Sequence, residues 1–441
     1  MNLLEAYKNR LRVSESVYSR GHEGEKMDTH RKLVIAKCLE NTNKYLNEAF
    51  DNSTGTQRSD MGMFKKFCLN LTTVALPNLI ANDLVIVQPM SSMSGFITYI
   101  KYVAGTNKGE TEQGDLFNSP FALGNVDRNY TNDKVVEAAP AEGDMTLAWT
   151  PVVEKAFTVD EGGVQVQYDV KIIAADGTIT YANLVDGKVP AASLSEGAKV
   201  AYMYDNIVIP QNDLPILNAK MESIALVAHA RRIAVYYSQI AAFQAKTDYG
   251  FDLGDQLAEK AVGQLEYEID TEVTQLLIDN AEGPAVPGTL TWSKTLPIGV
   301  SKRDHYAGFM EIVELAKKEV YDRTKRFVPN YMVCASDLIP VLSFIDSFKA
   351  APTSNINGPY YAGTLGSLKV FVTPNITAGD FVIGVNGNDM MSSAAVYAPY
   401  MPVVPTQLLQ FADGATSQGF STLYDLKLLN KALLVKGNIV A

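Results

Sequence analysis

An abrupt change of pattern in the middle of the chain is the feature that most constrains its fold. Residues 105–204 are rich in Gly, Asp, Asn, Thr and Val, and VQVQYDVKIIAADGTITYANLVDG within them alternates as strands do. Its segment Ala174–Gly177 is typical of a hairpin turn. From Leu217 onward the apolar spacing becomes helical. The sequence therefore predicts a β-rich insertion, a small subdomain, inside a chain that mixes helices and strands.

The stretch LPNLIANDLVIVQPM, residues 76–90, predicts a short strand that is entered through a turn. Each of its prolines fixes its own φ and biases the residue before it away from helix, so Leu84–Val87 is bracketed as a strand. We expect Asn78 and Asn82 to hydrogen-bond the backbone in this turn. The β-branched and aromatic residues at about 91–104 predict a further strand.

The first 60 or so residues predict a polar, charged arm of two helical pieces. In the second piece, MDTHRKLVIAKCLENTNKYLNEAF, Asp28 or Thr29 can serve as N-cap. Its apolar stripe consists of Leu33, Ala36, Leu39, Leu46 and Phe50. So narrow a stripe buries too little surface to fold alone, so we expect the arm to lie in a groove of a neighbouring subunit.

Two long amphipathic helices are predicted in succession after Leu217. The apolar face of the first is Leu226, Ala230, Ile233, Tyr237 and Ile240. After the break KTDYGFDLGD, the face of the second is Leu257, Ala261, Leu265, Ile269, Val273 and Leu276.

A third helix is expected after Asp304. Its inward face is Phe309, Ile312, Val313, Ala316 and Val320. A buried strand, NYMVCAS, and a short helix from Ser336 follow it. From Ser367 onward, short aliphatic strands alternate with Gly, Pro and Asn turns.

The acidic balance of the chain limits its partners. The 441 residues carry a formal net charge of −11, so a broad attraction to nucleic acid and a DNA-reading role are disfavoured. Cys38, Cys68 and Cys334 form no CxxC pair, which favours reduced thiols in a cytosolic setting. No apolar run approaches the roughly 20 residues of a membrane helix, and the N-terminus lacks an apolar signal region. We expect a soluble protein made without an export signal.

The residue types that carry out catalysis are not arranged for it. His22, His30, His229 and His305 fall on separate predicted elements, without a metal-ligand spacing. No GxSxG or Walker A pattern occurs, and GTLGSLKV lacks the lysine and helix of a phosphate loop. Cys334, with no histidine near it in sequence, is predicted to be a buried core residue rather than a nucleophile.

Two pairs of acidic residues are also not predicted to be catalytic. Glu266 with Glu268, and Asp252 with Asp255, are expected to lie among solvated helix-end charges that serve capping and solubility. The sequence thus predicts no catalytic, cofactor-binding or metal site. Its 22 tyrosines suit a protein whose work is contact with other proteins.

Four segments, in the same order, resemble those of tailed-phage major capsid proteins of the T4-like branch. Residues 64–105 are similar to the part where the chain leaves an N-terminal arm and enters the strands of the capsid fold. Residues 230–273 resemble the long spine helix, a connection and a second helix. Residues 330–344 resemble the strand and helix of the axial domain. Residues 361–374 and 380–405 resemble the strands that close that domain.

The resemblance implies an α+β, HK97-like capsid fold in six parts. These are an N-terminal arm (1–62), the first strands of the peripheral domain (63–104), an extended loop with a β-rich insertion (105–205), the peripheral domain with its spine helix (206–300), the axial domain (301–400) and return strands to the peripheral domain (401–441).

The same resemblance implies a structural major capsid protein, not an enzyme. It would self-assemble into hexamers and pentamers of an icosahedral head and enclose double-stranded DNA without reading its sequence. Portal, scaffold and decoration proteins are expected partners, without a membrane or cofactor, and the location is the virion after assembly in the host cytoplasm. Alternatives on the same fold are a vertex (penton) paralogue and an encapsulin-type compartment protein. The alternative from another class is an enzyme or carbohydrate-binding module with a site in residues 105–205.

Overall fold

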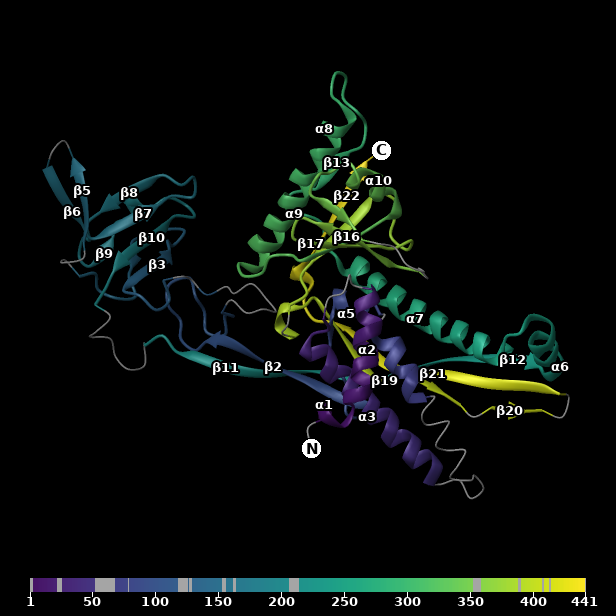
Figure 1. Ribbon diagram of the computed structural model, residues 1–441. Coiled ribbons are helices and arrows are strands. Elements are labelled where there is room, and N and C mark those ends of the chain that lie inside the picture. The colour runs from purple at the N-terminus through teal and green to yellow at the C-terminus, as the bar shows by residue number, and fades with distance from the viewer. Residues whose placement is uncertain are drawn as a thin grey trace. The chain divides into compact units, whose positions relative to one another are not determined.

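The computed structural model describes residues 3–21, 26–51, 68–77, 79–117, 126, 129–152, 156–161, 164–205, 214–351, 358–387, 390–406, 408–411 and 414–440. Helices and strands are mixed, which confirms the predicted α+β class (Figure 1). The chain forms two compact units: one comprises Met1–Ile97 and Ile224–Ala441, and the other Thr98–Ser223. The predicted β-rich insertion is therefore a unit of its own.

A seven-stranded mixed sheet forms one part of the larger unit. Its strands, in spatial order, are β13 (Thr291–Ser293), β22 (Leu434–Val440), β18 (Asp380–Gly384), β14 (Tyr331–Cys334), β17 (Leu368–Val372), β16 (Tyr360–Leu365) and β15 (Phe348–Ala350). The central strands β18, β14 and β17 are almost entirely buried, which explains their continuous apolar runs. β14 is the strand predicted from NYMVCAS, and the predicted short helix is the 3₁₀ turn Ser336–Leu338 with α10 (Ile339–Leu342).

Helix α9 (Phe309–Thr324) packs on this sheet and follows α8 (Lys302–Ala307). Four members of its predicted inward face are fully buried, namely Phe309, Val313, Ala316 and Val320. Phe309 meets Phe381 of β18 edge-on, with ring centroids 5.5 Å apart. The third predicted helix is therefore confirmed, together with the face that it buries.

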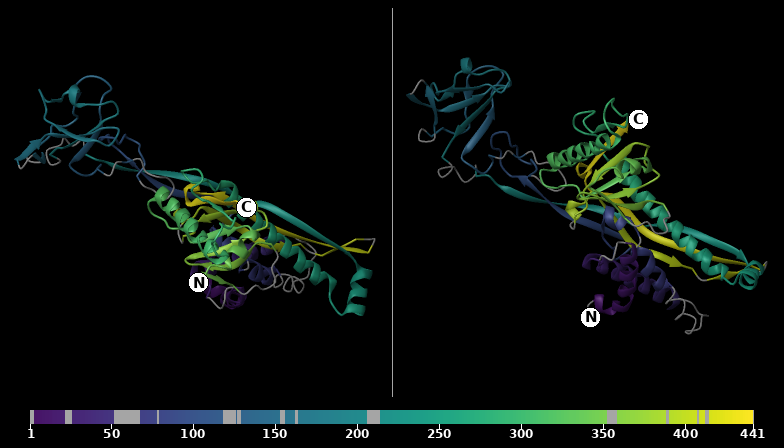
Figure 2. Two further views of the ribbon diagram at one scale, coloured as in Figure 1. Left: turned by 90° about the horizontal axis from the view of Figure 1, so that it is seen from above. Right: turned by 45° about the horizontal axis from the view of Figure 1, so that its top comes forward.

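A second sheet, of five strands, forms the other part of the larger unit. Its order is β1 (Ile86–Val87), β19 (Ala395–Pro405), β21 (Ala415–Leu428) and β12 (His229–Ser238), and β20 (Leu409–Gln410) also pairs with β21. Helix α7 (Leu253–Asn280) packs along β12 and β21 (Figures 1 and 2). It is the second of the predicted long helices. β19 and β21, with 11 and 14 residues, are longer than the short strands expected after Ser367.

The prediction of the first of the two long helices is wrong. Its residues lie in β11 (Leu217–Val227), in β12 and in the short helix α6 (Gln239–Gln244), which a π-helical turn, Ala245–Tyr249, extends. β12 pairs antiparallel with β21 over its whole length. Its half-buried residues are Ile233, Val235 and Tyr237, which recur with the period of two of a strand. A full set of partners on β21 outweighs the helix propensity of the alanines and arginines in this segment.

The strand predicted at Leu84–Val87 is shorter than expected. A four-residue helix, α5 (Ala81–Leu84), takes its first position, and β1 runs parallel to β19 over two residues. Asn82 Nδ2 donates a hydrogen bond to the carbonyl oxygen of Leu76 at 2.7 Å, as predicted for this turn. Asn78 lies outside the described residues.

The N-terminal arm contains α1 (Leu3–Ala6), α2 (Lys8–Gly21) and α3 (Thr29–Asp51), and a further helix covers residues 68–77. α3 is the helix predicted from the arm sequence. Ala36, Leu39 and Leu46 of its stripe are buried and Leu33 is exposed, while the side chain of Phe50 lies outside the described part.

The expectation that the arm lies in a groove of a neighbouring subunit is wrong, because α3 packs on its own chain. It contacts β19, and Leu39 shares a hydrophobic cluster with Leu84 and Tyr397. Asn41 Nδ2 donates to the carbonyl oxygens of Met90 and Tyr400 at 2.7 and 3.1 Å. The five-stranded sheet supplies the surface that a stripe this narrow lacks by itself.

The smaller unit is built from short strands. β3 (Lys134–Ala138), β10 (Lys199–Met203), β7 (Val170–Ile173) and β8 (Ile179–Ala182) form an antiparallel sheet, while β4 (Met145–Thr146) pairs with β9 (Lys188–Val189) and β5 (Phe157–Glu161) with β6 (Val164–Tyr168). The turn predicted at Ala174–Gly177 joins β7 to β8, and Gly177 there has a φ of 86°. β2 (Ser94–Ala104) confirms the strand predicted at about 91–104, and it pairs with β11. The smaller unit also has a short 3₁₀ turn at Ala191–Ser193. Two further 3₁₀ turns, at Met390–Ser392 and Lys431–Leu433, belong to the larger unit.

Candidate functional sites

The three histidines in the described part of the chain do not converge on a site. His30 and His305 each place Nε2 within 3.0 Å of a backbone carbonyl oxygen. His229 is exposed on β12 rather than on the predicted helix, and His22 lies outside the described residues. In the described part of the chain, no three His, Cys, Asp or Glu side chains form a group that could hold a metal ion.

The cysteines and the glycine-containing stretch GTLGSLKV, which the sequence analysis considered as candidates for chemistry, have structural roles. Cys334 is fully buried in β14, as predicted, and burial raises the pKa of its thiol. Cys38 and Cys68 are buried free thiols as well. The stretch GTLGSLKV forms the turn between β16 and β17, where Gly366 has a φ of 59°, and not a loop in front of a helix.

Asp252 is the N-cap of α7, as predicted for its pair. Its Oδ1 accepts the backbone N–H groups of Gly254 and Asp255 at 2.9 and 3.4 Å. The other predicted pair is placed differently from the expectation. Glu266 and Glu268 lie in the middle of α7, not among its end charges, and Glu266 is half-buried.

A buried carboxylate on α7, Asp270, was not anticipated from the sequence. Its Oδ1 accepts the backbone N–H of Ala81, the first residue of α5, at 3.1 Å. Burial raises the pKa of Asp270 to about 7, although the N–H bonds that it accepts act in the opposite direction. Burial and the charge of Asp270 raise the pKa of Glu266 to about 8. Burial is the first cause of both shifts, so they do not by themselves indicate a catalytic dyad.

Helix α5 is a joint at which several elements meet. Asp83 Oδ1 pairs with Arg31 of α3 at 2.5 Å and with Lys369 of β17 at 3.5 Å. Asn386 Nδ2 donates to the carbonyl oxygen of Asp83 at 2.8 Å. Together with Asp270 of α7, these bonds fix the arm, α7 and the seven-stranded sheet to the four residues of α5.

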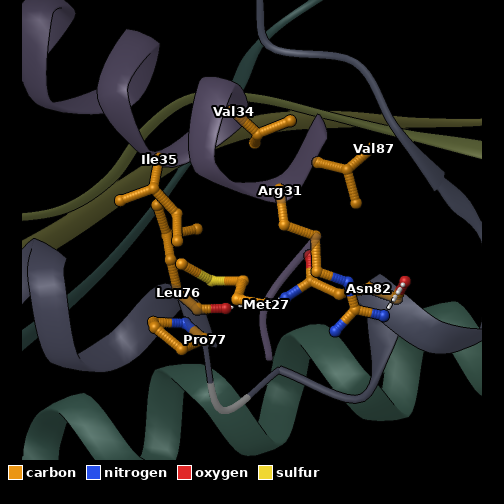
Figure 3. A pocket seen from close by; sticks show the side chains of 8 residues that line it. All are labelled: Met27, Arg31, Val34, Ile35, Leu76, Pro77, Asn82 and Val87. Carbon is orange, nitrogen blue, oxygen red and sulfur yellow. Dashed lines mark hydrogen bonds between the residues drawn. The ribbon is translucent and has the colours of Figure 1, made fainter. Parts of the chain in front are cut away.

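A small cavity beside this joint is too small for a ligand. Figure 3 shows Arg31 from α3 reaching the carbonyl oxygen of Asn82, to which it donates at 3.0 Å. Met27, Leu76 and Val87 are among the apolar side chains around it. The volume is about 10 Å³, at the lower limit for a single water. The joint is therefore packed structure and not a binding pocket.

A wider groove, hereafter the α7 groove, runs between α7 and the five-stranded sheet. It has a volume of about 490 Å³, and residues that line it include Arg231, Tyr267, Glu268, Leu276, Asp279 and Leu426. Glu272, also in its wall, accepts from Arg231 at 2.5 Å and from the hydroxyl of Tyr424. The groove thus joins an apolar lining to carboxylates, which suits contact with a segment that is both apolar and basic.

Exposed apolar side chains gather in two other places. Around α6, more than half of the surface is exposed in each of Tyr236, Ile240, Phe243 and Tyr249. The backbone N–H of Gln239 donates to the carbonyl oxygen of Gly414, which ties α6 to the turn before β21. Residues 294–301, hereafter the β13–α8 loop, expose Leu296, Ile298 and Val300. Contiguous apolar surface of this kind marks contact sites between proteins.

In the smaller unit, a buried lysine has a structural role. Lys108 Nζ donates to the carbonyl oxygens of Asn129 and Tyr130 at 3.1 and 3.0 Å and to that of Asn132. The same ammonium lies 5.0 Å from the ring centroid of Tyr204. With these partners Lys108 ties residues 129–132 to the segment before them.

Sequence reasoning missed the α7 groove and the α5 joint. The groove combines residues of β12, α7 and β21, and no local spacing links them. The β13–α8 loop did carry a signal, because Leu296, Ile298 and Val300 alternate around a Pro-Ile-Gly turn between two lysines. In the described part of the chain, no helix is long and apolar enough to cross a membrane.

The sequence matches the family model of the major capsid protein Gp23 over residues 61–438. Two similar curated proteins are the major capsid proteins of Vibrio phage KVP40 and Enterobacteria phage T4. The first is 20% identical over 384 residues, which cover 80% of this chain and 74% of the relative. The second is 20% identical over 385 residues, which cover 80% and 73%.

Solved structures give weaker likenesses. A structure from Microbacterium phage Oxtober96 is 10% identical, with coverage of 82% of this chain and 90% of its own and a TM-score of 0.37. An encapsulin complex from Synechococcus elongatus is 10% identical, with coverage of 50% and 77% and a TM-score of 0.32. Scores this low carry no argument about this chain.

Proposed function

We propose, from the premise that this chain belongs to the Gp23 family of major capsid proteins, that it builds the hexamers and pentamers of an icosahedral phage head. The observation that carries the proposal is the family match over residues 61–438. Family membership confirms the T4-like resemblance of the sequence and, with it, a major capsid protein of the virion. The HK97-like form of its α+β fold is part of the proposal.

The parts of this subunit follow the proposed capsid architecture. The seven-stranded sheet with α8, α9 and α10 would be the axial domain, which also takes β13 and β22 from outside residues 301–400. The five-stranded sheet with α7 as spine helix would be the peripheral domain. The smaller unit would be the extended loop and insertion, and it would touch an adjacent subunit.

The head is proposed to enclose double-stranded DNA without reading its sequence. The net charge of −11 supports this, because a container must not hold on to what it packages. Portal, scaffold and decoration proteins are proposed as partners, with assembly in the host cytoplasm. No catalytic, cofactor or metal site is proposed, since the family is one of structural proteins.

Negative-stain electron microscopy of the purified full-length chain tests the proposal. Closed shells or tubes of capsomers are expected. Pentamers alone would indicate a vertex paralogue instead. A small discrete oligomer would contradict the proposal and favour an enzyme or carbohydrate-binding module.

A further inference from the structure

Two carboxyl groups lie one helical turn apart on α7, and α5 packs on one of them. Glu266 and Asp270 are four residues apart, a spacing that puts both side chains on the same face of the helix. Asp270 is only 8% exposed, and its Oδ1 accepts the N–H of Ala81 at 3.1 Å. Ala81 and Leu84 of α5 are buried in this contact region. α5 therefore covers a carboxyl group that water would otherwise reach.

The basic side chains at this contact are bound elsewhere. Arg31 of α3 and Lys369 of β17 both pair with Asp83 of α5. In the described part of the chain, neither Glu266 nor Asp270 pairs with a basic side chain. Asp83 adds its own negative charge near Asp270. Ionisation of the pair would therefore gather three carboxylates, with the cations held by one of them.

The other elements around Asp270 do not change this balance. Tyr397 of β19 faces Asp270, and burial raises the pKa of its hydroxyl, so it stays neutral. Further titratable groups around Tyr397 are Cys38 of α3, Tyr424 of β21 and Glu272 of α7. Arg231 of β12 pairs with Glu272 at 2.5 Å. Within the described residues, these surroundings thus add no positive charge that is not already paired.

Protonation decides whether this contact is stable. Burial is the first cause that raises the pKa of Asp270 from 3.8 to about 7 and that of Glu266 from 4.5 to about 8. The closed contact thus holds protons that an opened and hydrated contact would release. Opening is therefore favoured as the pH rises from about 4 to about 8, and no further above that range.

We infer that Glu266 and Asp270 form a proton-dependent latch that holds α5 on α7. While both are protonated the pair stays covered, and when both are ionised water enters and α5 separates from α7. Because Asp83 of α5 binds Arg31 of the arm and Lys369 of β17, the latch sets how firmly the arm, α7 and the seven-stranded sheet are held together. The latch acts within one chain, so it does not depend on the proposed assembly.

Hydrogen exchange with mass spectrometry on the full-length chain tests the latch at pH 5.5 and pH 8. Each exchange rate is divided by that of an unstructured peptide at the same pH, which removes the intrinsic pH dependence. The protection of residues 79–86 should fall at least about tenfold between the two pH values. At pH 8 the protection of β14 should stay at least about tenfold above that of α5, because the opening is local.

A pair of matched double variants assigns the effect. Glu266→Gln with Asp270→Asn removes both charges and nearly preserves the side-chain shapes. This variant should keep the protection of α5 at pH 8 within about twofold of its value at pH 5.5. Glu259→Gln with Asp279→Asn makes the same two changes at exposed positions of α7, and it should show the same fall as the unmodified chain.

Three results would each overturn the inference. The first is constant protection of α5 in the unmodified chain. The second is equal protection of α5 and β14 at pH 8, because the whole chain would then unfold instead of opening at one contact. The third is a fall that persists in the Glu266→Gln, Asp270→Asn variant or disappears in the Glu259→Gln, Asp279→Asn control, because other groups would then carry the pH dependence.

Discussion

Helix α7 and strand β12 are neighbours that pack against each other, and the sequence predicted both to be long helices. α7 buries ten of its residues, from Ala258 to Ile278, whereas β12 has no residue that is fully buried. A spacing of three and four between apolar residues predicts a helix reliably where each of these residues is buried in a core, as in α7. In a sheet surface that is only half-covered, the same spacing arises by chance from a period of two.

The packing partners explain the difference. The first half of α7 buries Ala261 and Leu265 in one cluster, and its second half buries Ile269 and Val273 in the cluster of the seven-stranded sheet. β12 contributes only the partly buried side chains of Ile233 and Val235 to the first cluster. Its main support is the backbone hydrogen bonding with β21. The helix is thus held by its side chains and the strand by its backbone.

The largest expected effect breaks the helix side of the comparison. Val273→Asp should cost at least about 4 kcal/mol and leave little folded subunit, because a carboxylate would be buried with no partner at a site of 0% exposure. Urea denaturation followed by circular dichroism measures the loss. Gln275→Asp, at a half-buried position of α7 in the wall of the α7 groove, is the control and should cost less than about 1 kcal/mol. Equal losses would show that the buried face has been assigned wrongly.

The next effect depends on pH and concerns the buried carboxylate of α7. The pKa of Asp270 is about 7 in the folded chain, above the ordinary value of 3.8. Between these values the folded state keeps a proton that the unfolded chain has released, so stability falls as the pH rises through this window. Asp270→Asn removes the charge while its carbonyl can still accept the N–H of Ala81. The variant should therefore gain stability relative to the original chain, by about 3 kcal/mol more at pH 8 than at pH 4.5.

Thermal melts across this pH range check the sign. Asp279→Asn removes one charge from the exposed end of the same helix, so it controls for the change in net charge. A gain for Asp270→Asn that is as large at pH 4.5 as at pH 8 would contradict the assignment of the raised pKa to Asp270. Glu266→Gln should also stabilise the chain more at high pH than at low pH, because burial and the charge of Asp270 raise the pKa of Glu266 as well.

Sequence patterns sufficed where burial is continuous and local. α9 with its buried face and β14 are examples, and the segment of β14 also resembled the capsid family. Sequence patterns did not suffice for the arm. They predicted the apolar stripe of α3, but not the surface that covers it, because that surface lies in β19, far along the chain. Asp270 was missed for the same reason, since an acidic residue on a helix indicates solvent unless its partner, here Ala81, is known.

The strand side of the comparison is tested by alternation. Ile233→Asp should cost about 1–2 kcal/mol, well below the loss at a core site, because Ile233 is only half-buried and a carboxylate there can reach water. Ala234→Asp, on the opposite face of β12, should change stability by less than about 0.5 kcal/mol. Urea denaturation of both variants separates a strand from a helix. A larger loss for Ala234→Asp would contradict the period of two.

The smallest effect concerns the point where the chain turns from β12 and α6 into α7. Asp252 accepts two backbone N–H groups that the first turn of a helix leaves without partners, so Asp252→Ala should cost about 1 kcal/mol. Asp255 lies in the same turn but is not the cap, so Asp255→Ala should lose only a few tenths of a kcal/mol from its interaction with the helix dipole. Because α7 is held mainly by its buried side chains, the cap variant should still fold and only fray. Hydrogen exchange should therefore increase at residues 253–256 of the Asp252→Ala variant and stay unchanged around Val273. If protection fell along the whole helix, the N-cap and not the packed face would be holding α7, and the contrast with β12 would fail.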